Sequence, residues 1–148
     1  MVVFNTPVAF EVAQTSLAVE VPSGTLLTYD SNGLLNYATA ASGRFDAILI
    51  SAILNTTDYM NQYYIYNEVD FGPYVKIGDP VSVAKVNRVT ANGLAVSAPG
   101  AIAAGSALEI GANGVLVLHS AGTIVAYALD AIALGATLTG AVHILGTV

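Results

Sequence analysis

The side chains that could carry acid–base or metal chemistry are few in this chain, and their spacing does not suit it. The 148 residues include two histidines, no cysteine and ten acidic residues. His119 and His143 each lie in an apolar run, with no second histidine or glutamate at the spacing of a zinc site. The lack of cysteine excludes disulfides and thiolate ligands. We therefore predict structural histidines, no metal site and no cofactor.

A nucleophile or a pair of catalytic carboxylates is equally hard to find. Neither Ser42 nor Ser120 lies in the Gly-x-Ser-x-Gly turn that exposes a catalytic serine. Asp46 and Asp130 lie at related places near the third strand of two similar segments, but Ala-Ile follows each of them, where a paired-aspartate protease has Thr-Gly or Ser-Gly. Residues 30–33 (DSNG) lack the later carboxylate of a calcium loop and predict a turn. The sequence thus predicts that the protein is not an enzyme.

The elements that would position such residues are strands, and they occur as a repeat. Residues 24–35 (GTLLTYDSNGLL) and 105–116 (GSALEIGANGVL) share an opening glycine, an apolar run, an Asn-Gly pair and a second apolar run. Asn-Gly between such runs predicts a hairpin with a type I′ turn. The third strands, DAILISA and VAYALDA, align after a two-residue indel, and a looser third copy from Gly78 has its Asn-Gly at Asn92-Gly93.

These patterns predict an all-β protein, a small β-barrel or sandwich of repeated hairpins. The expected strands are 25–29, 34–38 and 45–53 in the first copy and 108–110, 115–119 and 123–132 in the second. The chain length suits one domain, which we place at 23–148. An extended N-terminal arm, 1–22, should precede it.

The composition limits the partners that the protein can have. Hydrophobic residues make up 55% and charged residues 9%, against roughly 25% charged in an average soluble domain. Part of the surface is therefore expected to be buried against another subunit. Four basic residues and a net charge of −6 exclude a phosphate-binding stripe, so no nucleic acid is expected. The best membrane window, 121–138, contains Asp130 and two glycines, so we expect no membrane span and a soluble protein made inside the cell.

Two stretches outside the repeats are candidate contact surfaces. The 1–22 segment, punctuated by Pro7 and Pro22, is either an arm that reaches a neighbouring molecule or a first strand of the domain. The insert at 54–74 is rich in tyrosine, which supplies stiff, amphipathic contact area at interfaces. It is either a partner-binding loop or an ordinary hairpin that caps the domain. The candidate partner-binding residues are Val2, Val3, Phe4, Phe10, Tyr59, Tyr63, Tyr64, Tyr66, Phe71 and Tyr74.

The second part of the chain resembles the capsid decoration, or cement, proteins of tailed phages. The resemblance lies in GDPVSV at 78–83, NGL at 92–94, AGSAL at 104–108, GVL at 114–116 and IVAYA at 124–128. It covers residues 78–148, and the tyrosine-rich insert is not part of the family pattern.

The resemblance implies a mostly β virion protein that forms homotrimers on the outer capsid surface. Such trimers lie near three-fold positions, clamp the major capsid protein and stabilise the shell, often through an N-terminal arm. A strand added to a sheet edge would gain affinity from backbone hydrogen bonds. The alternative is a small carbohydrate- or ligand-binding β-barrel, in which Tyr64 and Tyr66 share one strand face and stack on sugar rings.

Overall fold

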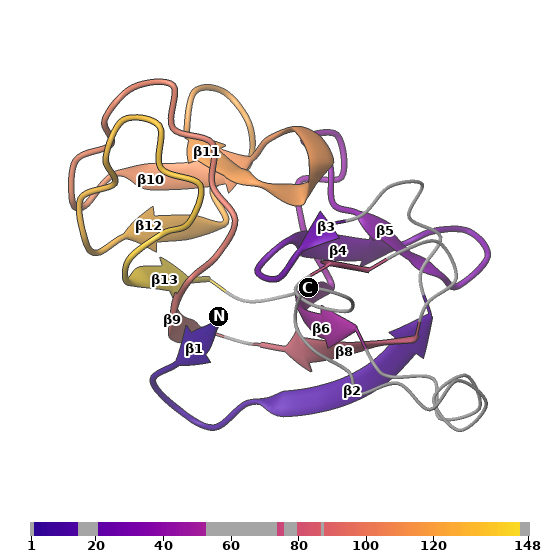
Figure 1. Cartoon of the computed structure of the whole chain (residues 1–148). Helices are drawn as coiled ribbons and strands as arrows, with labels where there is room; N and C mark the ends of the chain where they lie inside the picture. The colour runs from indigo at the N-terminus through magenta and orange to yellow at the C-terminus, as the bar shows by residue number, and fades with distance from the viewer. Residues whose placement is uncertain (1, 15–20, 53–73, 76–79, 87, 146–148) are drawn as a thin grey trace.

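The computed structural model describes residues 2–14, 21–52, 74–75, 80–86 and 88–145. Two antiparallel sheets form a sandwich-like, all-β structure, so the predicted fold class is confirmed (Figure 1). Figure 1 shows the larger sheet on the left and the smaller one on the right, with the N-terminal strands β1 and β2 along the bottom. Within the described residues, no helix is long and apolar enough to cross a membrane.

The sheets are named A and B. Sheet A has the order β1 (Val3–Phe4), β9 (Val89–Asn92), β13 (Val142–Ile144), β12 (Ala126–Ala128), β10 (Ala107–Ile110) and β11 (Leu116–Leu118). Sheet B has the order β2 (Ala9–Gln14), β8 (Pro80–Lys85), β6 (Ala47–Ala52), β4 (Leu26–Tyr29) and β5 (Leu35–Tyr37). Two short strands, β3 (Val21–Pro22) and β7 (Tyr74–Val75), pair separately, and a 3-10 turn, η1 (Ala112–Gly114), precedes β11.

The hairpin predicted twice from the sequence is present twice with the same register. The hairpin residues of the two copies lie 81 positions apart, and the third strands lie 79 apart, so the predicted two-residue indel is confirmed. The matching cross-strand pairs are Leu27–Tyr37, Tyr29–Leu35 and Leu27–Ala47 in sheet B, and Leu108–Leu118, Ile110–Leu116 and Leu108–Ala126 in sheet A.

The repeat extends beyond the hairpins to five strands in each sheet. The order β2-β8-β6-β4-β5 in sheet B has the same connectivity as β9-β13-β12-β10-β11 in sheet A. The outer pairs also match in register: Ile48–Ala84 and Phe10–Ala84 correspond to Tyr127–His143 and Thr90–His143. The chain is therefore built from two copies of one five-stranded unit.

The largest change in the offset between the copies lies in one long connection. It is 79 residues at the third strand (Ile48 to Tyr127) and 59 at the fourth (Ala84 to His143). The connection from β6 to β8 is therefore 20 residues longer than the one from β12 to β13. The predicted tyrosine-rich insert falls in this longer connection.

The turns of the two hairpins differ from the tight type expected. Asp30 N donates to Leu34 O and Gly111 N donates to Val115 O, each at 2.8 Å, so three residues form each loop. The last loop residue is a glycine with positive φ, 75° in Gly33 and 69° at its counterpart, Gly114. Three-residue loops that end in a residue of left-handed conformation are, like two-residue type I′ turns, common connections of β-hairpins.

The predicted third copy is wrong. The expected hairpin at Asn92-Gly93 would pair β9 with residues 94–96, but β9 pairs with β1 and β13, and Ala95 and Val96 bridge to Leu138 and Leu116. Gly93 follows the last residue of β9, and its N–H donates to Thr139 O at 3.1 Å. The Asn-Gly pair there marks the point where the chain leaves sheet A.

The two sheets contribute opposite faces to the main core. In sheet A the core face contains the large residues of the repeat, Leu108, Leu116 and Val142. Their counterparts in sheet B belong to a separate cluster on the other face, composed of Leu27, Leu35, Ala47, Leu49 and Val83. Sheet B instead turns Leu26, Ile48 and Ala84 toward the main core. Equivalent faces of the two copies therefore point in the same direction, which we call a front-to-back arrangement. The face of sheet A that points away from the main core, its back face, carries Tyr127 and His143 and remains at the surface.

The N-terminal segment is part of the sheets and does not stand apart from them. β1 pairs with β9 at one edge of sheet A, and β2 pairs with β8 at one edge of sheet B. Val2, Phe4 and Val8 pack against the main core. The expectation of a free arm is therefore corrected for residues 2–14, because their apolar side chains find partners within the chain itself.

Candidate functional site

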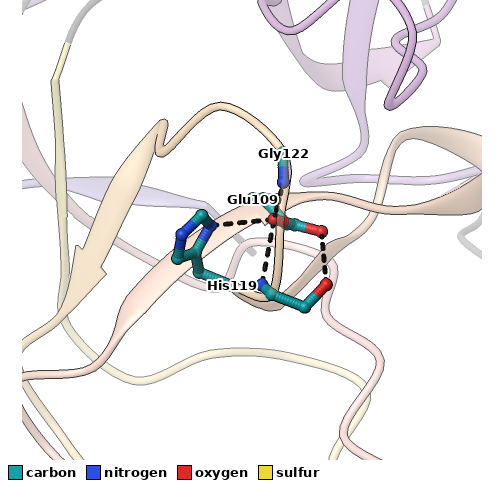
Figure 2. Close-up of polar contacts among 4 residues, drawn as sticks. Glu109, His119 and Gly122 are labelled. Atoms are coloured by element: carbon teal, nitrogen blue, oxygen red, sulfur yellow. Dashed lines mark hydrogen bonds and ion pairs between the residues drawn. The ribbon is translucent and has the colours of Figure 1, made fainter.

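The most concentrated polar contacts of the described residues surround Glu109 on β10. Its Oε2 accepts hydrogen bonds from Gly122 N at 2.7 Å and Ser120 N at 3.1 Å, and it lies 2.9 Å from His119 Nδ1. Its Oε1 accepts from Ser120 Oγ at 3.3 Å. Figure 2 shows the carboxylate between the imidazole and the Gly122 amide. Because an ionised carboxylate can only accept, His119 Nδ1 carries the proton in this pair.

These bonds stabilise the charged form of Glu109. The N–H groups of Ser120 and Gly122, with a smaller contribution from His119, lower its pKa from 4.5 to about 2. Hydrogen bonds to the ionised form have this effect on any carboxyl group. Glu109 is therefore an anion at every physiological pH and cannot act as a general acid.

The grouping of Glu, His and Ser does not form a catalytic triad. In a triad the imidazole links the carboxylate to the serine hydroxyl. Here the Ser120 hydroxyl bonds the Glu109 carboxylate directly, and His119 contacts the same carboxylate, so the imidazole does not lie between them. The cluster instead fixes the loop between β11 and β12, whose residues 119–122 close around one side chain.

Other acidic residues also fix loops. Asp46 Oδ2 accepts from Thr28 Oγ1 at 2.6 Å and from Tyr29 N at 3.0 Å. Asp130 Oδ2 accepts from Ala141 N at 2.9 Å. Asp46 precedes β6 and aligns with Val125, whereas Asp130 follows β12, so both aspartates lie near the third strand of their copy, as predicted, but at different positions of it. In the described part of the chain, no three His, Asp or Glu side chains gather as metal ligands would.

The predicted N-terminal contact residues lie together on the surface. We call Val2, Val3, Phe4, Val8 and Phe10 the N-terminal patch. They line an open groove of about 430 Å³ together with residues 5–7. The Phe4 and Phe10 rings meet edge to face, with centroids 6.4 Å apart. Val3 and Phe10 are 53% and 58% exposed, so this patch leaves apolar area open to a partner.

The remaining predicted contact residues belong to the tyrosine-rich insert. Tyr59, Tyr63, Tyr64, Tyr66 and Phe71 lie outside the described residues. The backbone of Tyr74 lies in β7, opposite Pro22.

Two features of the surface were missed from the sequence. The pairing of Glu109 with His119 was not foreseen, although their hairpin register follows from the repeat. Leu134, 68% exposed, lies in the loop between β12 and β13. Its small-residue surroundings (LGATLTG) resemble any apolar stretch of this chain, so no sequence signal marks it as exposed.

Comparison with known proteins yields a likeness in structure alone. No family model and no curated protein matches the sequence. Among solved structures, the N base of head fiber gp8.5 in bacteriophage phi29 aligns with a TM-score of 0.56 and 17% identity, over 95% of this chain and 98% of that chain. The fold is that of a phage head fiber base. Both chains are covered almost completely, so the likeness includes both copies of the five-stranded unit.

Proposed function

We propose that this protein is a structural component of a phage virion. It lies on the outer surface of the head, where it binds the major capsid protein as a homotrimer and stabilises the shell. The observation that carries the proposal is the structural likeness to a head fiber base along nearly the whole of both chains. The resemblance of residues 78–148 to capsid decoration proteins points to the same place in the virion.

The surface of the molecule supports a binding role without catalysis. Glu109, Asp46 and Asp130 are occupied in fixing loops. The N-terminal patch exposes apolar side chains of the kind that fills the centre of protein interfaces. A repeated small interface in a homotrimer also multiplies affinity for a shell that presents the same site many times. The tyrosine-rich insert is a second proposed contact.

The location is tested on particles of the phage that encodes the chain. Mass spectrometry of purified heads should detect the protein, and heads made after deletion of its gene should lack it and bind the recombinant chain again. Heads that never contain the protein would contradict the proposal.

The stabilising role needs a separate measurement. Heads without the chain should release their DNA at a lower temperature than heads with the recombinant chain restored. If the two preparations release DNA at the same temperature, the protein attaches to the head without cementing it. In that case the role of a fiber base remains and the role of a cement protein is wrong.

The oligomeric state is tested in solution. Light scattering should give three times the 15.1 kDa mass of the chain. A stable monomer at micromolar concentration would contradict the homotrimer and leave attachment to the head unaffected.

A further inference from the structure

The Asn-Gly pairs of the chain are a chemical feature that the proposed function does not use. An asparagine followed by glycine is prone to deamidation, because glycine has no side chain to hinder the attack of its backbone nitrogen on the asparagine amide. The chain has three such pairs, which begin at Asn32, Asn92 and Asn113. All three asparagines are exposed. The three sites differ in the surroundings of the glycine that follows.

The reaction requires the glycine nitrogen to move. This nitrogen forms a bond to Cγ of the asparagine, the Cγ–Nδ2 bond breaks, and the proton of the glycine N–H leaves with the ammonia. Water then opens the resulting succinimide ring to aspartate or isoaspartate. The two reacting atoms meet only when the backbone turns about the Cα–C bond of the asparagine. A glycine that another element holds in place therefore reacts only after a local opening of the structure.

Gly93 and Gly114 are held in this way, and both are buried. Gly93 N donates to Thr139 O in the loop between β12 and β13, at 3.1 Å. Gly114 N donates to Ala38 O of the first copy, also at 3.1 Å. A Cβ on Gly114 would lie 2.2 Å from Leu26 O, so backbone of the other copy lies directly against it. Turning either glycine requires two elements that are distant in sequence to separate.

Gly33 is the counterpart of Gly114 in the first copy, and its surroundings are open. It is exposed, and a Cβ on it would meet no atom of the described residues within 4 Å. Its N–H donates to Asp30 O at 3.1 Å, within the same three-residue loop. Turning Gly33 therefore breaks a hydrogen bond at the tip of a hairpin, and such tips open at the lowest free energy.

We propose that Asn32, in the loop between β4 and β5, is the site at which the folded chain deamidates. The reaction consumes water, releases ammonia and places a new carboxylate two residues after Asp30. Each event adds one negative charge to a chain whose net charge is already −6. The fold protects the equivalent Asn113 and the third pair at Asn92. The inference does not depend on the proposed function.

Peptide mass mapping measures all three sites in one sample of the folded chain, kept in mildly alkaline buffer. Trypsin leaves Asn32 in a peptide that ends at Arg44, and a further cut after Glu109 separates Asn92 from Asn113. The peptide with Asn32 should gain the mass of aspartate or isoaspartate at least about tenfold faster than the other two, because its glycine needs the smallest opening. Circular dichroism verifies that the chain stays folded during the incubation.

The same chain in concentrated urea is the control, because unfolding removes the differences between the three glycines and their rates should become similar. Asn32→Gln should abolish the mass gain in the first peptide, since a longer side chain closes the ring far more slowly, and Asn113→Gln should leave that gain unchanged. If Asn92 or Asn113 reacts as fast as Asn32 in the folded chain, the proposal is wrong. A folded chain in which Asn32 stays intact while the unfolded chain is fully modified also overturns it.

Discussion

Gly24 and Gly105 occupy the same position in the two copies of the five-stranded unit, with φ of 90° and 86°. The N–H of Gly24 donates to Leu49 O at 2.8 Å, and that of Gly105 donates to the equivalent Ala128 O at 2.6 Å. Their surroundings differ. A Cβ on Gly24 would lie 2.4 Å from Gly93 O, whereas a Cβ on Gly105 would have no atom within 4 Å. Of these two equivalent glycines, Gly24 lies at the contact between the copies and Gly105 does not.

This difference predicts unequal effects of one substitution. Gly105→Ala should cost about 1–2 kcal/mol, which is the strain of a left-handed residue with a side chain. Gly24→Ala should cost the same strain and, because backbone atoms cannot move away cheaply, about 1–3 kcal/mol more from the overlap. Urea unfolding at pH 7 measures both free energies.

Gly105→Ala is itself the control for Gly24→Ala, since φ and the hydrogen bond match. Equal losses in the two variants would mean that the copies do not approach each other closely at Gly24. A larger loss in Gly105→Ala would contradict the arrangement outright.

The Glu109 carboxylate should make part of the stability depend on pH. Its pKa is about 2 in the folded protein and 4.5 ordinarily. The folded state therefore favours the ionised form, and this contribution is complete above about pH 4.5 and lost as the pH falls through about 2. Glu109→Gln should lower the melting temperature at pH 7, and the difference from the natural chain should shrink toward pH 2.

Glu11→Gln is the matched control, because it removes the same charge from an exposed residue of β2. Its melting temperature should follow that of the natural chain across the pH range. A constant difference between Glu109→Gln and the natural chain from pH 7 to pH 2 would show that the hydrogen bonds of the carboxylate do not depend on its charge.

The repeated hairpin was predictable because its signals are local. A glycine, an apolar run and Asn-Gly at fixed spacing determine a hairpin and its register within about a dozen residues. The alignment of DAILISA with VAYALDA even located the two-residue indel. The same local rule failed at Asn92-Gly93. There the partners of β9 are β1 and β13, which lie far away in sequence.

The parts that depend on distant contacts could not be predicted. The 1–22 segment has the extended pattern of either an arm or a strand, and only pairing with β8 and β9 decides between them. The Glu109 cluster depends on the loop at 119–122 folding back over β10, which no motif marks. Val3 and Phe10 were predicted to bind a partner; the structure leaves both exposed in the N-terminal patch, and the binding itself stays a prediction.

The front-to-back arrangement of the copies predicts opposite sensitivity at one pair of equivalent residues. Ile48 on β6 is fully buried in the main core, whereas its counterpart Tyr127 on β12 is 37% exposed on the back face of sheet A. Ile48→Ala should therefore cost about 2–5 kcal/mol, the usual loss for a buried aliphatic side chain. Tyr127→Ala should cost less than about 1 kcal/mol, although it removes more atoms. Urea unfolding of both variants measures the difference. A two-fold symmetric sandwich, in which both residues would face inward, predicts losses of similar size, so comparable values would rule out the front-to-back arrangement.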